Sequence, residues 1–322
     1  MEKECFFTKK KIFIILVVWQ VFIAVIVLKF GMTTPSAKGI TKDHDKVNSL
    51  FTLIPEIPQN TTLLIAINTI PSKFERRETL RGTWAKQTSL SLTDNTSSAA
   101  NLHDMMNIAY FFTVGFAGNS SIDRDTKSES GIHKDILRVN LSESYRGIVT
   151  KILLTFEWMT SLDAKPRFIV KADDDVYIKL PDLARWMKDN QLPAKLYAGF
   201  VHRRVKVIRS TKSPFWVQQY TNKYFPSYCA GPFYILSRDV FLDVVRTSKV
   251  AKVFPVEDAY IGVLVNKTGV TPKETGRSLF NWVRILRPEM MEKIPVGVVF
   301  GDKLSSQNIQ QLHRAYCKLT GS

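Results

Sequence analysis

The stretch Phe168-Ile169-Val170-Lys171-Ala172-Asp173-Asp174-Asp175 decides how this chain is expected to fold. Its apolar start predicts a buried strand, and its three consecutive carboxylates mark the polar end of that strand. Adjacent carboxylates repel one another, and they become favourable when a divalent cation such as Mg²⁺ or Mn²⁺ takes them as ligands. Ligands bind at the carboxyl ends of strands in open α/β sheets. The stretch therefore predicts a metal site able to neutralise a diphosphate, and a solvated acidic turn is the alternative interpretation.

Similar apolar runs and helical patterns flank this strand on both sides. They predict strands at 63–68, 110–115, 135–141 and 167–170, and helices at 76–87, 148–160 and 181–190. The alternation of strands and helices predicts an α/β fold whose mostly parallel sheet is covered by helices. The polar segments 95–101 and 118–130 are interpreted as loops. Beyond residue 195 the pattern is less regular and rich in aromatic residues, which indicates a second, substrate-binding half of one compact domain.

The first part of the chain is apolar and predicts a membrane anchor. Residues 12–28 contain Gln20 as their only polar side chain, and the run can extend to Met32. Three lysines precede it, so the positive-inside rule places the N-terminus in the cytosol. We therefore expect a cytoplasmic tail at 1–11, a signal-anchor helix at 12–32, a proline-containing stem at 33–60 and a lumenal domain at 61–322. A cleaved signal peptide is the alternative.

The chain of 322 residues carries a formal charge of +16, which raises the question of an anionic partner. A lumenal domain argues against nucleic acid as that partner. The densest basic stretch, 202–209, is interpreted as a solvated strand or loop, with a contact to nucleotide phosphates or anionic lipid headgroups as the alternative. Lumenal topology is also supported by five glycosylation sequons, which begin at Asn60, Asn95, Asn119, Asn140 and Asn266.

The chain contains three cysteines, too few for a disulfide framework. Cys5 belongs to the predicted cytosolic tail. Cys229 and Cys317 belong to the oxidising compartment, so a single disulfide between them is possible.

A second acidic site lies at Glu257-Asp258 and precedes an apolar, helix-forming run. Carboxylates in the first turn of a helix interact favourably with its dipole, and this is the structural interpretation. The functional interpretation is that one of them is a general base that removes a proton from an attacking hydroxyl. A metal-binding triplet and a separate base together fit a direct displacement at a sugar carbon.

Two further segments admit two interpretations each. Arg77 and Arg81 are four residues apart and share a helix face, where they would bind an anion together or form an ordinary surface ladder with glutamates. The aromatic stretch 224–237 would either stack on sugar rings or fill the core.

Six motifs occur in one order along the chain, and together they resemble a known family. They are Arg77-x-x-x-Arg81-x-Thr83-Trp84, Phe112-x-x-Gly115, Glu129…Asp135-Ile136, Lys171-x-Asp173-Asp174-Asp175, Tyr228-Cys229-x-Gly231 and Glu257-Asp258-x-Tyr260-x-Gly262. On these residues the chain resembles the β1,3-galactosyltransferase family, which includes β1,3-N-acetylglucosaminyltransferases and the Brainiac-like glycolipid enzymes. The resemblance extends from about residue 64 to residue 270.

The resemblance implies a GT-A-type fold, a UDP-sugar donor, Mn²⁺ and an inverting single displacement. It implies that Asp175 ligates the metal directly, and that Asp173 and Asp174 contact the donor ribose or a metal-bound water. Asp173 is accordingly a candidate for both donor and metal binding. By position, Asp258 is the expected catalytic base with Glu257 beside it.

The family resemblance also assigns Arg77 and Arg81 to the donor site. Two departures from the family pattern concern the metal and the disulfide. Family members commonly have a histidine in a stretch like 298–304, where this chain has none, so Asp302 is the candidate for the last metal ligand and His313 a weaker one. Many members also have a cysteine where this chain has Leu264, which leaves Cys317 as the partner of Cys229, or no partner.

The expected function is that of a type II Golgi membrane enzyme. It would transfer a hexose, with galactose favoured over an N-acetylhexosamine, from a UDP-sugar to a glycolipid or glycoprotein acceptor in β1,3 linkage. Two alternatives are a metal-dependent phosphohydrolase and a catalytically inactive, membrane-tethered glycan-binding protein.

Overall fold

The computed structural model describes residues 50–86, 89–91, 105–190, 192–275, 279–281 and 297–321. Leu50–Ser322 form one compact unit. No helix in the described ranges is both long enough and apolar enough to cross a membrane. The cytoplasmic tail and the anchor predicted at 12–32 lie outside these ranges, as does most of the predicted stem.

A nine-stranded sheet is the centre of the described part of the chain. Its strands are β1 (Phe51–Leu53), β2 (Leu63–Asn68), β3 (Ser89–Ser91), β4 (Met105–Phe116), β5 (Ile136–Ser142), β6 (Phe168–Asp173), β8 (Tyr197–His202), β9 (Tyr228–Ser237) and β10 (Lys273–Glu274). They are ordered β1-β5-β4-β2-β6-β9-β8-β10, with β3 on β4. The four strands β5, β4, β2 and β6 are parallel, as predicted, and antiparallel pairs flank them.

The register of the sheet brings polar residues to one edge. Asn68 at the end of β2 is the register partner of Asp173 at the end of β6, so both lie at the carboxyl ends of parallel strands. Strand β9 runs antiparallel to β6 and places Tyr234 opposite Lys171. A small second sheet of β7 (Tyr177–Ile178), β11 (Phe280–Asn281) and β12 (Val299–Phe300) follows the acidic triplet.

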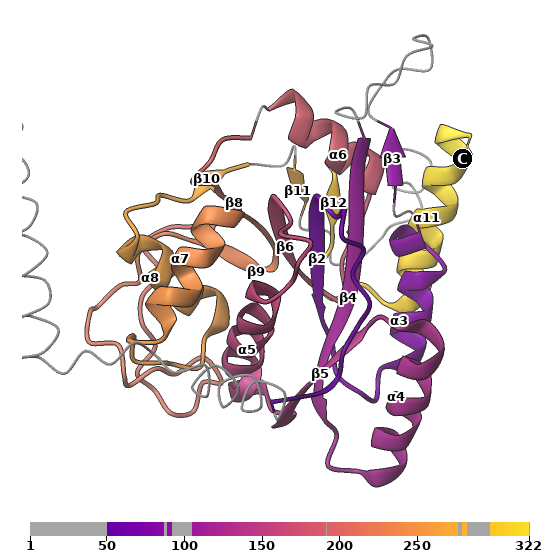
Figure 1. Ribbon diagram of the computed structural model, residues 1–322. Helices are drawn as coiled ribbons and strands as arrows, with labels where there is room; N and C mark the ends of the chain where they lie inside the picture. The colour runs from indigo at the N-terminus through magenta and orange to yellow at the C-terminus, as the bar shows by residue number, and fades with distance from the viewer. Residues whose placement is uncertain are drawn as a thin grey trace, which may run out of the picture. The chain divides into compact units, whose positions relative to one another are not determined.

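Helices cover both faces of the main sheet (Figure 1). Their bounds are α3 (Phe74–Arg81), α4 (Ser120–His133), α5 (Ile148–Thr160), α6 (Leu180–Asp189), α7 (Arg238–Ser248), α8 (Glu257–Lys267) and α11 (Ser306–Thr320), with 3₁₀ turns at Trp84–Lys86 and Tyr145–Gly147. Figure 1 shows α5, α7 and α8 on one side of the sheet, and α3, α4 and α11 on the other. This three-layer arrangement is the α/β architecture that the sequence predicts.

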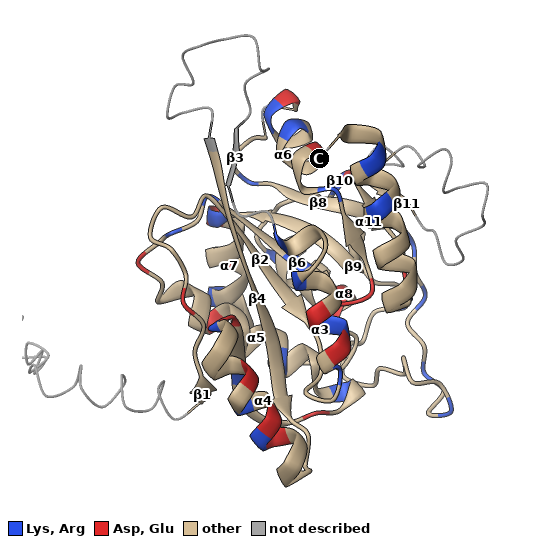
Figure 2. Cartoon of the chain, turned by 90° about the vertical axis from the view of Figure 1, so that its right-hand side faces the viewer, with Lys and Arg blue, Asp and Glu red and all other residues tan. Residues whose placement is uncertain are grey.

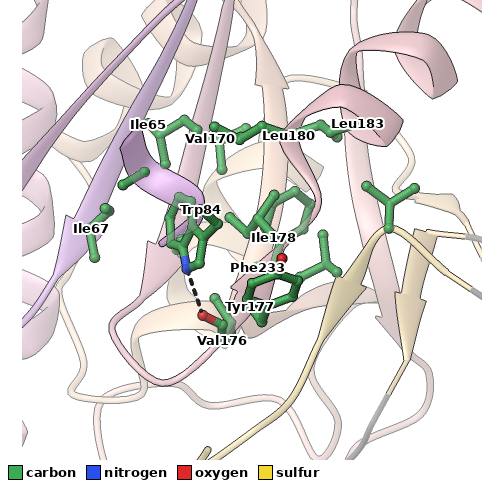
Figure 3. Packing of buried hydrophobic residues seen from close by; sticks show 14 of the residues in the cluster. Ile65, Ile67, Trp84, Val170, Val176, Tyr177, Ile178, Leu180, Leu183 and Phe233 are labelled. Atoms are coloured by element: carbon green, nitrogen blue, oxygen red, sulfur yellow. Dashed lines mark hydrogen bonds between the residues drawn. The ribbon is translucent and has the colours of Figure 1, made fainter. Parts of the chain in front are cut away.

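The hydrophobic core joins the main sheet to the segment that follows the acidic triplet. Val170 from β6 packs in one cluster with Trp84 and Ile178 (Figure 3). The indole Nε1 of Trp84 donates a hydrogen bond to the carbonyl of Val176 at 3.2 Å. Because this bond satisfies the polar end of a nearly fully buried ring, it fixes the turn that begins at the triplet.

Most predicted elements are confirmed, with shifts of a few residues at their ends. Helix α5 has the predicted bounds, whereas the helix predicted at 76–87 begins at Phe74 and ends at Arg81. The interpretation of 118–130 as a loop is wrong, because this segment forms most of α4. Strand β1 pairs with β5 within the segment predicted as stem, so the folded unit begins earlier than residue 61.

A buried ion pair attaches α3 to α4. Arg77 is fully buried and donates from Nε and Nη2 to the two carboxylate oxygens of Glu129, at 2.7 and 2.6 Å. The guanidinium also donates to the carbonyls of Ile70 and Pro71. Acidic and basic residues alternate along α3 and α4 (Figure 2). The Arg77–Glu129 pair from this pattern is buried on both sides.

Replacing Arg77 tests how much this ion pair stabilises the fold. The variant Arg77→Met leaves the buried Glu129 carboxylate short of its main partner, and we expect a loss of about 3–5 kcal/mol in the free energy of unfolding. Urea denaturation of the full chain measures it. The control is Arg246→Met, which removes the exposed pair with Asp243 and should change the free energy by about 0–1 kcal/mol. Equal effects of the two substitutions would contradict this role of Arg77.

Candidate active site

The acidic triplet lies where β6 ends, directly beside the end of β2. Asp173 is partly exposed, and its Oδ1 accepts from the Lys171 ammonium at 2.6 Å and from the Asn68 amide at 3.3 Å. The three carboxylates have different surroundings, which indicates different roles for them.

Asp174 points into the protein and is engaged on both oxygens. It is 3% exposed, accepts from the Thr69 hydroxyl at 2.6 Å, and lies 3.1 Å from the ammonium of Lys73. These contacts connect the triplet to the segment between β2 and α3. A carboxylate held in this way is better suited to shaping the site than to changing partners during a reaction.

Asp175 is the member of the triplet whose charge is least compensated. Its Oδ1 is buried and accepts no hydrogen bond in the described part of the chain. Burial raises the pKa of its carboxyl to about 6, and the nearby carboxylates of Asp173 and Asp174 add to this effect. Because the charged form is disfavoured, a cation placed beside Asp175 would relieve both the desolvation and the repulsion.

A C-terminal turn brings a further carboxylate close to Asp175. The amide of Leu304 donates to the carbonyl of Asp175 at 3.1 Å, and Asp302 contributes to the raised pKa of Asp175. Gly301 has φ +99°, and a Cβ there would lie 2.5 Å from the Leu304 side chain. The turn therefore requires glycine, and it brings Asp302 close enough to Asp175 for the two carboxylates to interact.

These residues fit a cation that is completed by its substrate. No group of three or more histidine, cysteine, aspartate or glutamate side chains converges in metal-binding geometry within the described ranges. Mg²⁺-like ions are commonly held by one or two carboxylates together with substrate phosphates and water. The unpartnered oxygen of Asp175 and the neighbouring Asp302 fit that mode of binding.

Two cavities lie on either side of Asp173. The first, which we call the Asp174 cavity, has a volume of about 510 Å³. It is lined by Asn68, Thr69, Ile70, Lys73, Glu143, Ser144, Tyr145, Ile148, Lys151 and the three aspartates 173–175. In its wall, the buried Lys151 ammonium lies 2.8 Å from Glu143 and donates to the carbonyl of Thr69.

The second cavity, the Asp258 cavity, measures about 450 Å³ and contains the second acidic motif. Its lining includes Lys171, His202, Phe215, Gly231, Glu257, Asp258 and Asp302. Asn68, Tyr145, Ile148 and Asp173 line both cavities. The structure thus brings the two acidic motifs, more than eighty residues apart in the sequence, into one continuous site.

Helix α8 begins at the second acidic motif and packs closely on β9. A Cβ added at Gly262 would lie 2.2 Å from the Cβ of Tyr228, so no larger residue fits at this contact. Glu257 and Asp258 occupy the first turn of α8, as predicted. The close packing fixes that turn against the strand that carries Gly231.

The two carboxylates of α8 differ in their partners. Glu257 accepts from the Tyr234 hydroxyl at 2.8 Å and lies 3.6 Å from the Lys171 ammonium. Burial raises the pKa of Glu257 to about 7, although Lys171 opposes the shift. Asp258 is held by two backbone amides, those of Ala259 at 2.8 Å and Gly231 at 3.1 Å.

Asp258 has the properties of a general base. Burial raises the pKa of its carboxyl, and the amides of Ala259 and Gly231 partly oppose the shift. It is less buried than Glu257 and lines the cavity, and its described hydrogen bonds come from backbone amides, while Lys171 and His202 lower its pKa from nearby. A base with a moderately raised pKa and access to a cavity can accept a proton from a bound hydroxyl.

Lys171 is the functional residue whose role sequence reasoning missed. It is 2% exposed and contacts Asp173, Glu257 and the carbonyl of Gly231. Burial alone would lower the pKa of its ammonium, but the carboxylates of Asp173 and Glu257 raise the pKa above its ordinary value. The signal available in the sequence was a lysine inside an otherwise apolar strand, directly before the triplet.

The arginines predicted for the donor site do not line either cavity. Arg77 is paired with Glu129. Arg81 donates to both oxygens of Asp135 at 2.8 Å, and its guanidinium lies over the Phe112 ring. The anions that these arginines bind therefore belong to this chain. Their motif, together with Glu129 and Asp135, fixes α3 and α4 to the sheet.

The sequence left open whether Cys229 and Cys317 pair, and in the structure both are free thiols. Cys229 is buried in β9 beside Gly199, and Cys317 lies on α11 with its Sγ 3.6 Å from the Nε2 of His313. The Nδ1 of His313 lies 3.1 Å from the Tyr177 hydroxyl. His313 does not line either cavity, so the structure gives no support to it as a metal ligand.

The remaining predicted sites lie on the surface. Asn60, Asn119, Asn140 and Asn266 are all exposed, while Asn95 lies outside the described residues. The basic stretch is an irregular, largely exposed segment after β8, in which Arg203 pairs with Glu274 and Arg204 lies over the Tyr224 ring.

Comparison with known proteins agrees with this geometry. Residues 75–275, which include both acidic motifs, match the family described as Galactosyltransferase. Lactosylceramide 1,3-N-acetyl-beta-D-glucosaminyltransferase A of Xenopus laevis is 28% identical over 223 residues, which cover 67% of this chain and 56% of the relative. Lactosylceramide 1,3-N-acetyl-beta-D-glucosaminyltransferase of Mus musculus is 27% identical over 224 residues, which cover 67% of this chain and 57% of the relative.

A third relative is named for a different acceptor. N-acetyllactosaminide beta-1,3-N-acetylglucosaminyltransferase 3 of Homo sapiens is 26% identical over 233 residues, which cover 69% of this chain and 59% of the relative. The matched part therefore spans a little over half the length of these relatives. The chain belongs to the galactosyltransferase family and is distantly related to β1,3-N-acetylglucosaminyltransferases.

Proposed function

We propose that this protein transfers a hexose from a UDP-sugar to an acceptor glycan in β1,3 linkage, with inversion at the sugar carbon. The observation that carries the proposal is the shared wall of the two cavities, in which Asp173 borders both and Asp258 borders the second. A donor diphosphate beside Asp175 and an acceptor hydroxyl beside Asp258 would then meet within one continuous site.

The reaction follows from the positions of these side chains. Asp258 takes the proton of the acceptor hydroxyl as the oxygen attacks the anomeric carbon. The bond from that carbon to the UDP oxygen breaks on the opposite side, and UDP leaves with the bonding electrons. Asp175 and Asp302 would hold the divalent cation, expected to be Mn²⁺, whose chemistry is to offset the charge of the leaving diphosphate.

We propose donor-side contacts from Lys73 and Asn68, which the sequence did not single out, beside Asp173, which it did. Lys73 is part-exposed at the wall of the Asp174 cavity and places a positive charge there, while Asn68 and Asp173 border its junction with the second cavity. The exposed rings of Tyr145 and Phe215 contact each other edge to face, with 6.0 Å between the ring centroids, and both line the cavity that contains Asp258. In this position they can stack on sugar faces.

Our proposal for the donor sugar and the acceptor draws on the names of the relatives. Their names favour N-acetylglucosamine as the sugar, whereas the family description favours galactose as the sequence analysis did. The acceptor we propose is a glycan like the lactosylceramide or N-acetyllactosaminide of those names. We further propose that residues 12–32 anchor the chain in the Golgi membrane with the catalytic unit in the lumen.

Incubation of the purified full chain with UDP-sugars tests this function. UDP-N-acetylglucosamine, UDP-galactose and UDP-N-acetylgalactosamine are each offered with Mn²⁺ and with lactosylceramide or N-acetyllactosamine, and the product linkage is determined by mass spectrometry and NMR. A β1,3-linked product supports the proposal. Phosphate release without transfer would instead support a phosphohydrolase, and glycan binding without turnover a binding protein.

Two matched amide substitutions test which carboxylate is the base. Asp258→Asn should lower kcat about 10²–10⁴-fold, because an amide cannot accept the proton. Glu257→Gln should lower kcat by only about tenfold, since Glu257 acts through hydrogen bonds that an amide partly replaces. Initial rates at saturating donor and acceptor measure both. The reverse order of effects would assign the base to Glu257.

Removal of the metal tests the role of Asp175. Activity should be lost on treatment with EDTA and return with Mn²⁺, and Asp175→Asn should raise the Mn²⁺ concentration required by about tenfold or more, because a charged ligand is lost. Isothermal titration of Mn²⁺ in the presence of UDP gives a readout independent of turnover. Asp239→Asn, remote from both cavities, is the control and should change neither measurement. Full activity in EDTA would contradict the assignment.

A further inference from the structure

Gly231 connects the two acidic motifs through its backbone. Its N–H donates to Asp258 Oδ2 at 3.1 Å, and its carbonyl accepts from the Lys171 ammonium at 2.6 Å. The same ammonium lies 2.6 Å from Asp173 Oδ1. A continuous series of polar contacts therefore runs from the donor side of the site, through Lys171 and Gly231, to the proposed base.

The described contacts of the Lys171 ammonium engage it on all sides. Three N–H bonds are available to it, and its described acceptors are Asp173, the Gly231 carbonyl and, at the longer distance of 3.6 Å, Glu257. The side chain is 2% exposed, so little water reaches the ammonium. Breaking one of these contacts would leave a buried polar group unpaired, which makes the arrangement rigid.

The Gly231 amide also connects Asp258, the proposed base, to strand β9 of the main sheet. Asp258 Oδ1 accepts from Ala259, its neighbour on α8, and this bond moves with the helix. Oδ2 accepts from the Gly231 amide on β9, across the cavity wall. The orientation of the carboxylate therefore depends on where the backbone on the two sides of Gly231 is held, since its N–H and its carbonyl belong to adjacent peptide groups.

We propose that Lys171 is a positioning residue for the transfer step, acting on Asp258 through the backbone of Gly231. By binding Asp173 and the Gly231 carbonyl with one ammonium, it sets the distance between the donor side of the site and the base. The inference rests on the proposed function for its catalytic consequence, and on the contacts alone for the coupling of Lys171 to Asp258.

A double-mutant cycle on the full chain tests this proposal. Lys171→Met should lower kcat about 100-fold, because the misplacement of a reacting group by about 1 Å has an effect of that size. The acceptor KM should change by less than about threefold, since the Lys171 ammonium is already bound by Asp173 and the Gly231 carbonyl. In an Asp258→Asn background, Lys171→Met should lower the remaining rate by no more than about threefold, because the base is already absent.

The thermal unfolding midpoints of the same four proteins give a readout that needs no turnover. The double variant should lose less than the sum of the two single shifts, since the contacts through Gly231 are shared. Arg138→Met is the control, because Arg138 is 7% exposed and binds Thr52 and the Asp123 carbonyl, away from both cavities. Arg138→Met should lower the unfolding midpoint without lowering kcat per folded molecule. Lys171→Arg should retain part of the kcat that Lys171→Met loses.

The outcomes separate this proposal from the proposed function. Additive effects in both measurements, or an unchanged kcat in folded Lys171→Met, would overturn the positioning role. Absence of transfer by the wild-type chain with every donor, together with non-additive midpoints, would sink the proposed function and leave the coupling of Lys171 to Asp258 standing.

Discussion

Repulsion among carboxylates gathered at one edge of the sheet is the constraint on which the site depends. The chain balances most of this charge with its own lysines, and it does so inside the protein, where water contributes little screening. The pairs are Asp173 with Lys171, Asp174 with Lys73, and Glu143 with Lys151. Among the described residues Asp175 has no such ion pair, and its buried Oδ1 accepts no hydrogen bond, so part of the negative potential stays uncompensated there.

The central fold was predictable because its signals are local. Parallel strands buried on both faces form continuous apolar runs, as in β2 and β6, and α5 has a regular apolar stripe. Helix α4 was missed because the residues that it buries are Thr126, Glu129 and Ser130, which show no apolar periodicity. The cap by Asn119, whose side chain accepts from the Ser121 amide, was the signal that would have identified it.

The candidate site was predictable in its acidic members and not in its cations. Asp175 and Asp258 stand out because acidic residues next to apolar runs are unusual. The partners of Arg77 and Lys171 depend on contacts across the fold, with α4 in one case and with β9 in the other. Spacing along the chain contains no information on these contacts, so one basic residue, Arg77, was assigned to the donor site and another, Lys171, was overlooked.

The glycine contact between α8 and β9 has a consequence for the timing of events in the site. With the backbone of Gly262 against Tyr228, the first turn of α8 cannot slide along the strand without a steric clash. The carboxylates there are held in place before any substrate arrives, so little reorganisation is needed at the moment of reaction. In the proposed transfer, slow steps would then arise from entry of the donor or departure of the nucleotide.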